Sequence, residues 1–207
     1  MHNNSDRKSM LRDAGILFAI TLIAGLLLGF VYELTKEPIR IQKEKTIQKA
    51  CGEVYADASI FKEARYVLSD NLQSELSDLH VKIGRVYCAL SDSGVLLGYV
   101  LESTTTEGYA GNITIYMGVT LEGYLNGISI LDISETPGLG MKADEILVPQ
   151  FVNKQVSSFV YTKSGSLSDL EIDAISGATI TTKAVTNAVN GGLLVAGELK
   201  EGEIYYE

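Results

Sequence analysis

The segment best suited to chemistry is residues 173–179, which read Asp-Ala-Ile-Ser-Gly-Ala-Thr. After it, the apolar side chains of residues 181–199 recur at the i, i+3, i+4 spacing of an amphipathic helix, which Thr181 or Thr182 can cap. A loop of small residues therefore runs into a helix N-terminus, where free backbone N–H groups and the positive end of the helix dipole favour an anion such as a phosphate. Small residues also precede many helices that bind nothing, so this pattern alone leaves both interpretations open.

Two further loops are rich in glycine. Residues 135–140 read Glu-Thr-Pro-Gly-Leu-Gly, in which the proline presets a turn and the glycines permit positive φ. Leu139 stands between two glycines, so its apolar side chain on a bare backbone suits packing against a flat ring, although an ordinary loop at the end of a strand has the same composition. Residues 107–111, Glu-Gly-Tyr-Ala-Gly, form a second glycine-rich approach to a strand.

The residues around these loops predict an α+β domain. Strands are expected at residues 83–90, 95–102, 113–119 and 128–133, with turns at 91–94 and at Asn126–Gly127. Apolar residues alternate along 113–119, which predicts a strand with one buried face. Consecutive strands joined by short turns favour an antiparallel meander. Residues 57–80 give no firm assignment, and the pattern becomes helical after residue 141.

Residues 14–32 form an apolar run of nineteen residues without a charge. As a helix, at about 1.5 Å per residue, the run covers roughly 28 Å, close to the thickness of the hydrocarbon core of a bilayer. A cleaved signal peptide is the alternative, but its apolar region is usually shorter and ends in small residues, whereas this run ends in Phe-Val-Tyr. We therefore expect an uncleaved transmembrane helix. A second helix is expected over 38–50, with Pro38 at its first position.

Charges before the apolar run predict its orientation. The short N-terminal tail holds Arg7, Lys8 and Arg12, and short basic flanks stay in the cytoplasm. The chain is then a single-pass protein of the cytoplasmic membrane whose main domain lies on the extracytoplasmic side. The expected segments are a cytoplasmic tail at 1–13, the transmembrane helix at 14–32, a stalk and helical lead-in at 33–80, the main domain at 81–199 and a polar tail at 200–207.

Composition excludes several classes of function. The chain has 207 residues and a formal net charge of −9, which opposes binding to nucleic acid because phosphate neutralisation needs clustered lysine and arginine. Two cysteines and two histidines are too few for an iron–sulfur cluster held by four thiolates, and His2 lies in a polar tail, so no metal site is expected. Cys51 and Cys88 are either a disulfide of an oxidising exterior or two buried thiols.

The order of the motifs resembles a known family. Asp-x-x-Ser-Gly-Ala-Thr at 173–179 is similar to the flavinylation motif of proteins that carry FMN covalently on a threonine. With the loops at 107–111 and 135–140, and behind a single anchor, it resembles the G subunit of the Rnf complex, a membrane-bound, ion-translocating electron-transfer assembly. The C subunit of the sodium-translocating NADH:quinone reductase is similar. The resemblance covers most of the chain and implies an FMN-binding domain at 81–199 with one FMN per chain.

The resemblance also implies a set of site residues. Thr179 is implied to carry the FMN through a phosphoester. The other implied cofactor-binding residues are Asp173, Ser176, Gly177, Ala178, Thr136, Gly138, Leu139 and Gly140. A threonine hydroxyl is a poor nucleophile without a base or a metal, and the sequence offers no base beside Thr179. The chain is therefore not expected to attach the FMN itself. The resemblance implies a separate Mg²⁺-dependent flavin transferase, which is expected to recognise Asp173.

The implied function is electron transfer within a membrane complex that couples ferredoxin–NAD redox chemistry to Na⁺ or H⁺ movement, with other membrane subunits of an Rnf-type complex as partners. We expect no independent enzyme and no catalytic residue, because no G-x-G-x-x-G motif for a nicotinamide nucleotide follows a strand. Two alternatives stay open: an extracytoplasmic flavoprotein of a non-pumping respiratory reductase, and a membrane-anchored ligand-binding domain without flavin.

Overall fold

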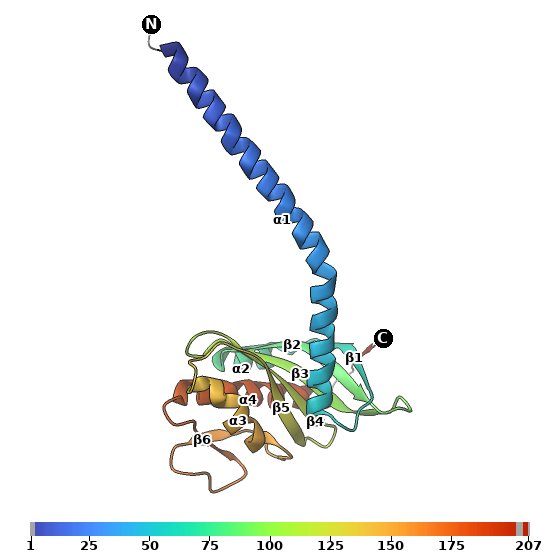
Figure 1. Ribbon diagram of the computed structural model, residues 1–207. Coiled ribbons are helices and arrows are strands. Elements are labelled where there is room, and N and C mark those ends of the chain that lie inside the picture. The colour runs from blue at the N-terminus through green and yellow to red at the C-terminus, as the bar shows by residue number, and fades with distance from the viewer. Residues whose placement is uncertain (1–2, 202–204, 207) are drawn as a thin grey trace. The chain divides into compact units, whose positions relative to one another are not determined.

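The computed structural model describes residues 3–201 and 205–206, and the chain divides into two compact units, Met1–Ile47 and Gln48–Glu207 (Figure 1). The first unit consists of helix. The second unit combines an antiparallel sheet with helices, which confirms the predicted α+β class. It begins well before residue 81, because the elements formed by residues 57–80 belong to it.

Helix α1 (Asn3–Val54) is continuous over 52 residues. In the described part of the chain it is long and apolar enough to cross a membrane, with a mean hydropathy of 2.5 over its most apolar 18 residues. The predicted helix start at Pro38 is wrong, because this residue lies inside α1. Proline costs a helix one backbone hydrogen bond, and side-chain pairs one turn apart support the helix around it: Arg40 pairs with both Glu37 and Glu44.

The sheet has six strands in the order β5-β4-β3-β2-β1-β8, and every neighbouring pair is antiparallel. The strands are β1 (Ile60–Arg65), β2 (Val81–Leu90), β3 (Leu96–Thr105), β4 (Ile113–Thr120), β5 (Leu125–Ile133) and β8 (Tyr205–Tyr206). Strands β2 to β5 follow one another in space as they do in sequence, as expected for a meander. Strand β8 pairs with β1, so part of the segment predicted as a polar tail belongs to the sheet.

The turn predicted at Asn126–Gly127 is wrong, because both residues lie inside β5. The chain reverses at residues 121–124 instead, where the Gly123 N–H donates to the Thr120 carbonyl over 3.0 Å. The ladder between β4 and β5 shifts its register beside Gly127. Such a β-bulge bends a strand locally, and it accommodates a dipeptide that would otherwise signal a turn.

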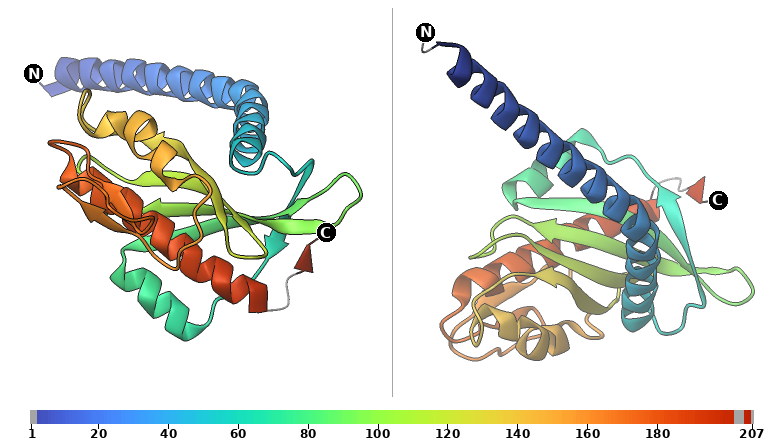
Figure 2. Two further views of the ribbon diagram at one scale, coloured as in Figure 1. Left: turned by 90° about the horizontal axis from the view of Figure 1, so that it is seen from below. Right: turned by 45° about the horizontal axis from the view of Figure 1, so that its top comes forward.

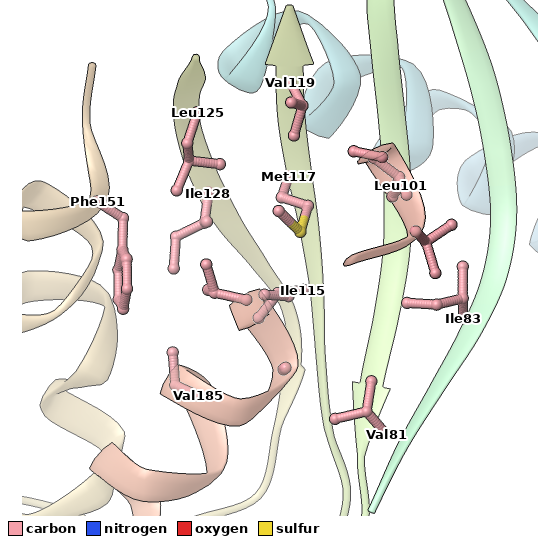
Figure 3. Close-up of a cluster of buried hydrophobic side chains, with 14 of the residues drawn as sticks. Val81, Ile83, Leu101, Ile115, Met117, Val119, Leu125, Ile128, Phe151 and Val185 are labelled. Atoms are coloured by element: carbon pink, nitrogen blue, oxygen red, sulfur yellow. The ribbon is translucent and has the colours of Figure 1, made fainter. Parts of the chain in front are cut away.

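Helix α4 (Thr179–Glu201) covers one face of the sheet, with α2 (Asp70–Asp78) beside it (Figure 2). The apolar stripe predicted for this helix faces inward: Val185, Ala188 and Val189 are fully buried against the sheet. Side chains from β2, β3, β4 and β5 gather with Val185 and with Phe151 of η2 (Val148–Phe151) in one apolar layer (Figure 3). This layer is the core that fixes the start of α4 relative to the strand ends.

The other face of the sheet is covered as well, so the prediction of a single buried face for residues 113–119 is wrong. Tyr116, on the face away from α4, is completely buried. The end of α1 and the residue after it pack over this face: Glu53 accepts a hydrogen bond from Ser129 (2.8 Å), and the Tyr55 hydroxyl donates to the Leu97 carbonyl (2.7 Å). The sequence pattern of one strand cannot reveal a helix that arrives from elsewhere in the chain.

Residues 57–80, left unassigned from the sequence, form β1 and α2. Ser69 caps α2 by accepting from the Leu72 N–H, and its hydroxyl donates to Glu198 of α4 over 2.6 Å. The remaining elements are η1 (Gly140–Lys142), α3 (Ala143–Ile146), β6 (Val160–Thr162) and β7 (Glu171–Asp173), of which β6 and β7 form a parallel pair.

Both cysteines lie in the second unit, Gln48–Glu207, as free, fully buried thiols. Burial raises the pKa of Cys51 to about 12 and that of Cys88 to about 11. Of the two interpretations left open by the sequence, the structure has the buried thiols.

Candidate functional site

An open cavity of about 470 Å³ lies where the two glycine-rich loops approach the start of α4. Sites for small-molecule ligands usually measure about 300–1,000 Å³. The lining residues are Tyr109, Glu135, Thr136, Leu139, Gly140, Gly177, Ala178, Thr179, Ile180 and Thr181. They come from the loop before β4, the loop after β5 and the junction of loop and helix at α4, three segments that the antiparallel sheet brings to one end.

Two glycines allow these segments to come together. Gly177 has φ +78°, a conformation that favours glycine, and a Cβ added to it would lie 3.2 Å from the Leu139 side chain. A Cβ added to Gly140 would lie 2.6 Å from the Thr181 hydroxyl and 2.7 Å from the Glu135 Cβ. The loop after β5 therefore packs directly against the first turn of α4, and only a residue without a side chain fits at the point of contact.

A buried carboxylate joins all three segments. Glu135 is only 7% exposed, and its Oε1 accepts the backbone N–H groups of Tyr109 (2.7 Å) and Ala110 (3.4 Å). Its Oε2 accepts the hydroxyl of Thr181 over 3.1 Å. Buried polar groups need such partners, and here the partners are the loop before β4 and the helix α4. Glu135 thus fixes the positions of the cavity walls.

The start of α4 differs from the prediction. Thr179 is the first residue of the helix, so neither Thr181 nor Thr182 is its cap. Thr181 turns inward to Glu135, and the Thr182 hydroxyl donates to the Ala178 carbonyl (3.0 Å) while accepting the Ile175 N–H (3.1 Å). The first turn of the helix keeps free N–H groups next to the cavity, which is the arrangement that favours an anion.

The structure brings together most of the residues that the sequence singled out. The predicted site residues that line the cavity are Thr136, Leu139, Gly140, Gly177, Ala178 and Thr179. Gly138, Ser176 and Asp173 are not among the lining residues. Gly138 and Ser176 each neighbour a lining residue in the sequence, whereas Asp173 lies at the end of β7, six residues before Thr179.

Asp173 is tied to its surroundings mainly through its backbone. Its N–H donates to the Gln150 side chain over 2.7 Å, and its carbonyl accepts from the same amide over 3.2 Å. One carboxylate oxygen accepts from Ser166 (3.3 Å). The other oxygen, Oδ1, is buried without a hydrogen-bond partner in the described part of the chain.

Sequence reasoning missed four lining residues as site residues: Tyr109, Glu135, Ile180 and Thr181. Glu135 opens the Glu-Thr-Pro-Gly-Leu-Gly loop, and Thr181 was considered only as a cap. Their hydrogen bond links positions 46 residues apart, so it depends on the tertiary fold. The positions of Tyr109 and Ile180 could have indicated that they line the site, because each is a large residue with apolar surface within or directly beside a motif.

The cavity combines apolar rims with little positive charge. Tyr109 is 68% exposed and Ile180 52%, so both present apolar surface at its mouth. The lining includes no lysine or arginine. The basic side chain in the first turns of α4, Lys183, bonds to Glu107 over 3.0 Å, and this hydrogen bond lowers the pKa of Glu107. Attraction for an anion near Thr179 therefore comes chiefly from backbone N–H groups and the helix dipole.

These features fit an FMN better than a metal or a nucleic acid. A planar ring needs flat apolar contacts and bare backbone, which Leu139, Ile180 and the Gly140 backbone supply. A phosphate needs N–H donors and room beside them, which the helix start at Thr179 supplies. Among the described residues, no cluster of histidine, cysteine or acidic side chains suits a metal ion.

Comparison with known families agrees with this geometry. Residues 108–193, which include every lining residue of the cavity, match the FMN-binding domain family. Residues 1–54, which end where α1 ends, match the RnfG N-terminal region.

Whole proteins similar to the chain carry related names. The G subunit of the Na⁺-translocating ferredoxin:NAD⁺ oxidoreductase complex of Acetobacterium woodii is 32% identical over 183 residues, which is 87% of this chain and 88% of the relative. The G subunit of the ion-translocating oxidoreductase complex of Methanosarcina acetivorans is 28% identical, over 91% of this chain and 95% of the relative. The crystal structure of Shewanella oneidensis NqrC matches 57% of this chain and 61% of its own, with 24% identity and a TM-score of 0.47.

The sequence identity with the Acetobacterium woodii protein extends over nearly the full length of both chains. One family match covers the long helix α1, and the other covers the part of the sheet domain that contains the cavity. The apolar helix and the related subunits together indicate a membrane-anchored protein. The chain therefore belongs to the family of Rnf-complex G subunits and carries an FMN-binding domain.

Proposed function

We propose that this chain is an electron-transfer subunit that carries one FMN covalently, through a phosphoester to the Thr179 hydroxyl. The observation that carries the proposal is the position of Thr179. It is the first residue of α4 and lines the same cavity as the Glu135–Gly140 loop. A phosphate on this hydroxyl would lie beside the free N–H groups of the helix start, and its ester would extend into the space between the loops.

The chain's own residues would hold and orient the cofactor. Leu139 and Ile180 offer apolar contact to a planar ring, and the Gly140 backbone offers close approach. Glu135 and Thr181 hold the loop and the helix at a fixed separation through their hydrogen bond. The FMN itself accepts and passes on electrons; the protein positions it and sets the charge around it.

Attachment is proposed to need a second protein. Glu135 is the carboxylate that lines the cavity, but the hydroxyl that donates to it belongs to Thr181 and not to Thr179, the proposed nucleophile. A threonine hydroxyl without a base or metal reacts slowly. A Mg²⁺-dependent flavin transferase would supply the activation. Recognition by that enzyme is proposed to involve Asp173, which lies at the end of β7, six residues before Thr179.

The family relationship supports the setting. Relatives are named as subunits of an ion-translocating oxidoreductase, so the other Rnf subunits are the proposed partners. We propose that the short basic tail stays in the cytoplasm and that the FMN domain lies outside, where it passes electrons in a complex that couples ferredoxin–NAD chemistry to Na⁺ or H⁺ movement. Protease added to spheroplasts should then cleave the sheet domain before lysis, and protection until lysis would refute the orientation.

The attachment site is tested by co-expressing the full chain with a flavin transferase. Denatured wild-type protein should fluoresce on a gel under ultraviolet light, and Thr179→Ala should not, because the acceptor hydroxyl is gone. Thr179→Ser keeps a hydroxyl and should retain part of the label. Thr136→Ala, which removes another hydroxyl from the cavity lining, is the matched control and should stay labelled. Peptide mapping that places FMN on Ser176, Thr181 or Thr182 would contradict the assignment, and so would label in Thr179→Ala.

A further inference from the structure

Glu135 is the most buried acidic or basic residue in the described part of the chain, with 7% of its surface exposed. Two backbone N–H groups and one hydroxyl donate to its carboxylate. These donors are neutral dipoles, so they stabilise the carboxylate without cancelling its charge. A carboxylate accepts hydrogen bonds and donates none, and each of these three groups donates one to it.

The charge is also left without a cation. None of the ion pairs among the described residues includes Glu135, and no lysine or arginine lines the cavity. Lys183, in the first turns of α4, is bonded to Glu107 instead. Burial keeps water from screening the carboxylate, so its field extends into the cavity with more strength than that of a surface charge.

We propose that Glu135 lowers the reduction potential of the flavin held in this cavity. The proposal rests on the proposed function, that the cavity holds FMN. The oxidised ring is neutral, and each electron that it gains without a proton adds a negative charge. A carboxylate at the cavity wall, close behind the Gly140 backbone, disfavours that added charge. Glu135 therefore acts as a tuning residue as well as a structural link between the loops.

The test compares reduction potentials in full-length chain that has been flavinylated by a co-expressed transferase and purified in detergent. Potentials are measured by redox titration with mediators, following the flavin absorbance. Glu135→Gln removes the charge but keeps the shape: its amide oxygen can accept the Tyr109 N–H, and its amide nitrogen can donate to the Thr181 oxygen. We expect the potential of Glu135→Gln to be more positive than that of the wild type.

A second variant distinguishes charge from structural disturbance. Thr181→Val keeps the side-chain volume and the Glu135 charge but removes the hydroxyl that donates to Oε2. With one dipole fewer to offset the charge, the potential should become more negative. The charge proposal thus predicts shifts of opposite sign for two variants of one hydrogen bond, whereas a loosened cavity would shift both in the same direction.

Glu122→Gln is the matched control, because it removes an exposed carboxylate at the turn between β4 and β5, the opposite end of these strands from Glu135. Its potential should equal that of the wild type. Labelled Glu135→Gln with an unchanged or more negative potential would overturn the proposal, as would a more positive potential in Thr181→Val. A wild-type chain without fluorescence on the gel would instead overturn the proposed function itself, before any potential is measured.

Discussion

Glu102 and Glu135 are both carboxylates withdrawn from water in the same domain, and their surroundings differ. Glu102 lies on β3, on the face that the end of α1 covers, where its Oε2 accepts the Arg85 guanidinium (3.2 Å) and the Tyr116 hydroxyl (3.0 Å). Glu135 follows β5 at the cavity, and its partners among the described residues are hydrogen-bond donors without a cation. One charge is neutralised by its neighbours, and the other is only solvated by them.

The different surroundings of Glu102 and Glu135 indicate that the two carboxylates have different roles. A buried charge without a counter-ion is expensive, and an apolar core seldom retains one. The Glu102 cluster compensates its charge internally, as expected for a site whose task is to join a helix to a sheet. No cation among the described residues compensates the charge at the cavity, so we expect this charge to act on a bound cofactor as well as to hold the loops. The predictions below test this contrast.

Removing the Glu135 side chain should have the largest effect on stability. Glu135→Ala leaves two backbone N–H groups and the Thr181 hydroxyl without their acceptor and opens space behind the Gly140 backbone. We expect a loss of about 2–4 kcal/mol in the free energy of unfolding. Thermal and denaturant unfolding of the full chain in detergent, followed by circular dichroism, measures it. Glu135→Gln is the control and should retain most of the stability; equal losses in the two variants would mean that the charge itself holds the loops.

Breaking the ion pair between Arg85 and Glu102 should lower the free energy of unfolding by a smaller amount. Arg85→Met keeps much of the side-chain length and leaves Glu102 with the Tyr116 hydroxyl as its remaining side-chain hydrogen bond among the described residues. The two side chains of this pair are 35% and 21% exposed, so water replaces part of the lost interaction. We expect a loss of about 1–2 kcal/mol. The potential of the attached flavin should not change, and a shift comparable to that of Glu135→Gln would remove the contrast between the two carboxylates.

The contrast also shows what the sequence could predict. The anchor, the four meander strands and the two loops of the cavity follow from local periodicity and from glycine and proline positions. Pro38 led to a wrong helix start because the long helix α1 continues through it. Asn126–Gly127 led to a wrong turn because a β-bulge accommodates this dipeptide inside β5. The environments of Glu102 and Glu135 were not predictable, because each depends on segments far apart in the chain that only packing brings together.

Tyr116 gives the Glu102 site a pH dependence. Burial, followed by the nearby Glu102 charge, raises the pKa of Tyr116 far above its usual range. A group whose pKa is higher in the folded state stabilises the fold fully below its unfolded pKa, about 10 for tyrosine, and this contribution is lost as the pH rises toward the folded value. Stability should therefore fall above about pH 10.

Tyr116→Phe should cost about 1 kcal/mol at neutral pH, the usual contribution of one hydrogen bond. It should also flatten the loss of stability in the alkaline range, because the group that titrates is gone. Unfolding curves measured at neutral and alkaline pH give both results. An alkaline loss as steep in Tyr116→Phe as in the wild type would assign the pH dependence to other tyrosines.

The smallest effect is expected at the two thiols, which form a natural pair of reporters. Burial raises the pKa of Cys51 to about 12; Arg85 lowers this value and Glu102 raises it. Cys88 has a pKa of about 11 for which burial alone is responsible. Glu102→Gln removes a charge that disfavours the Cys51 thiolate, so the Cys51 pKa should fall while that of Cys88 stays. Because the thiolate is the reactive form, the rate of alkylation of Cys51 relative to Cys88 should rise in the alkaline range.

Mass spectrometry of alkylated peptides gives the ratio of the two alkylation rates, and this ratio cancels any general loosening of the domain. Glu135→Gln should leave the ratio unchanged, and an equal response to both variants would show that the thiols report on stability rather than on the Glu102 charge.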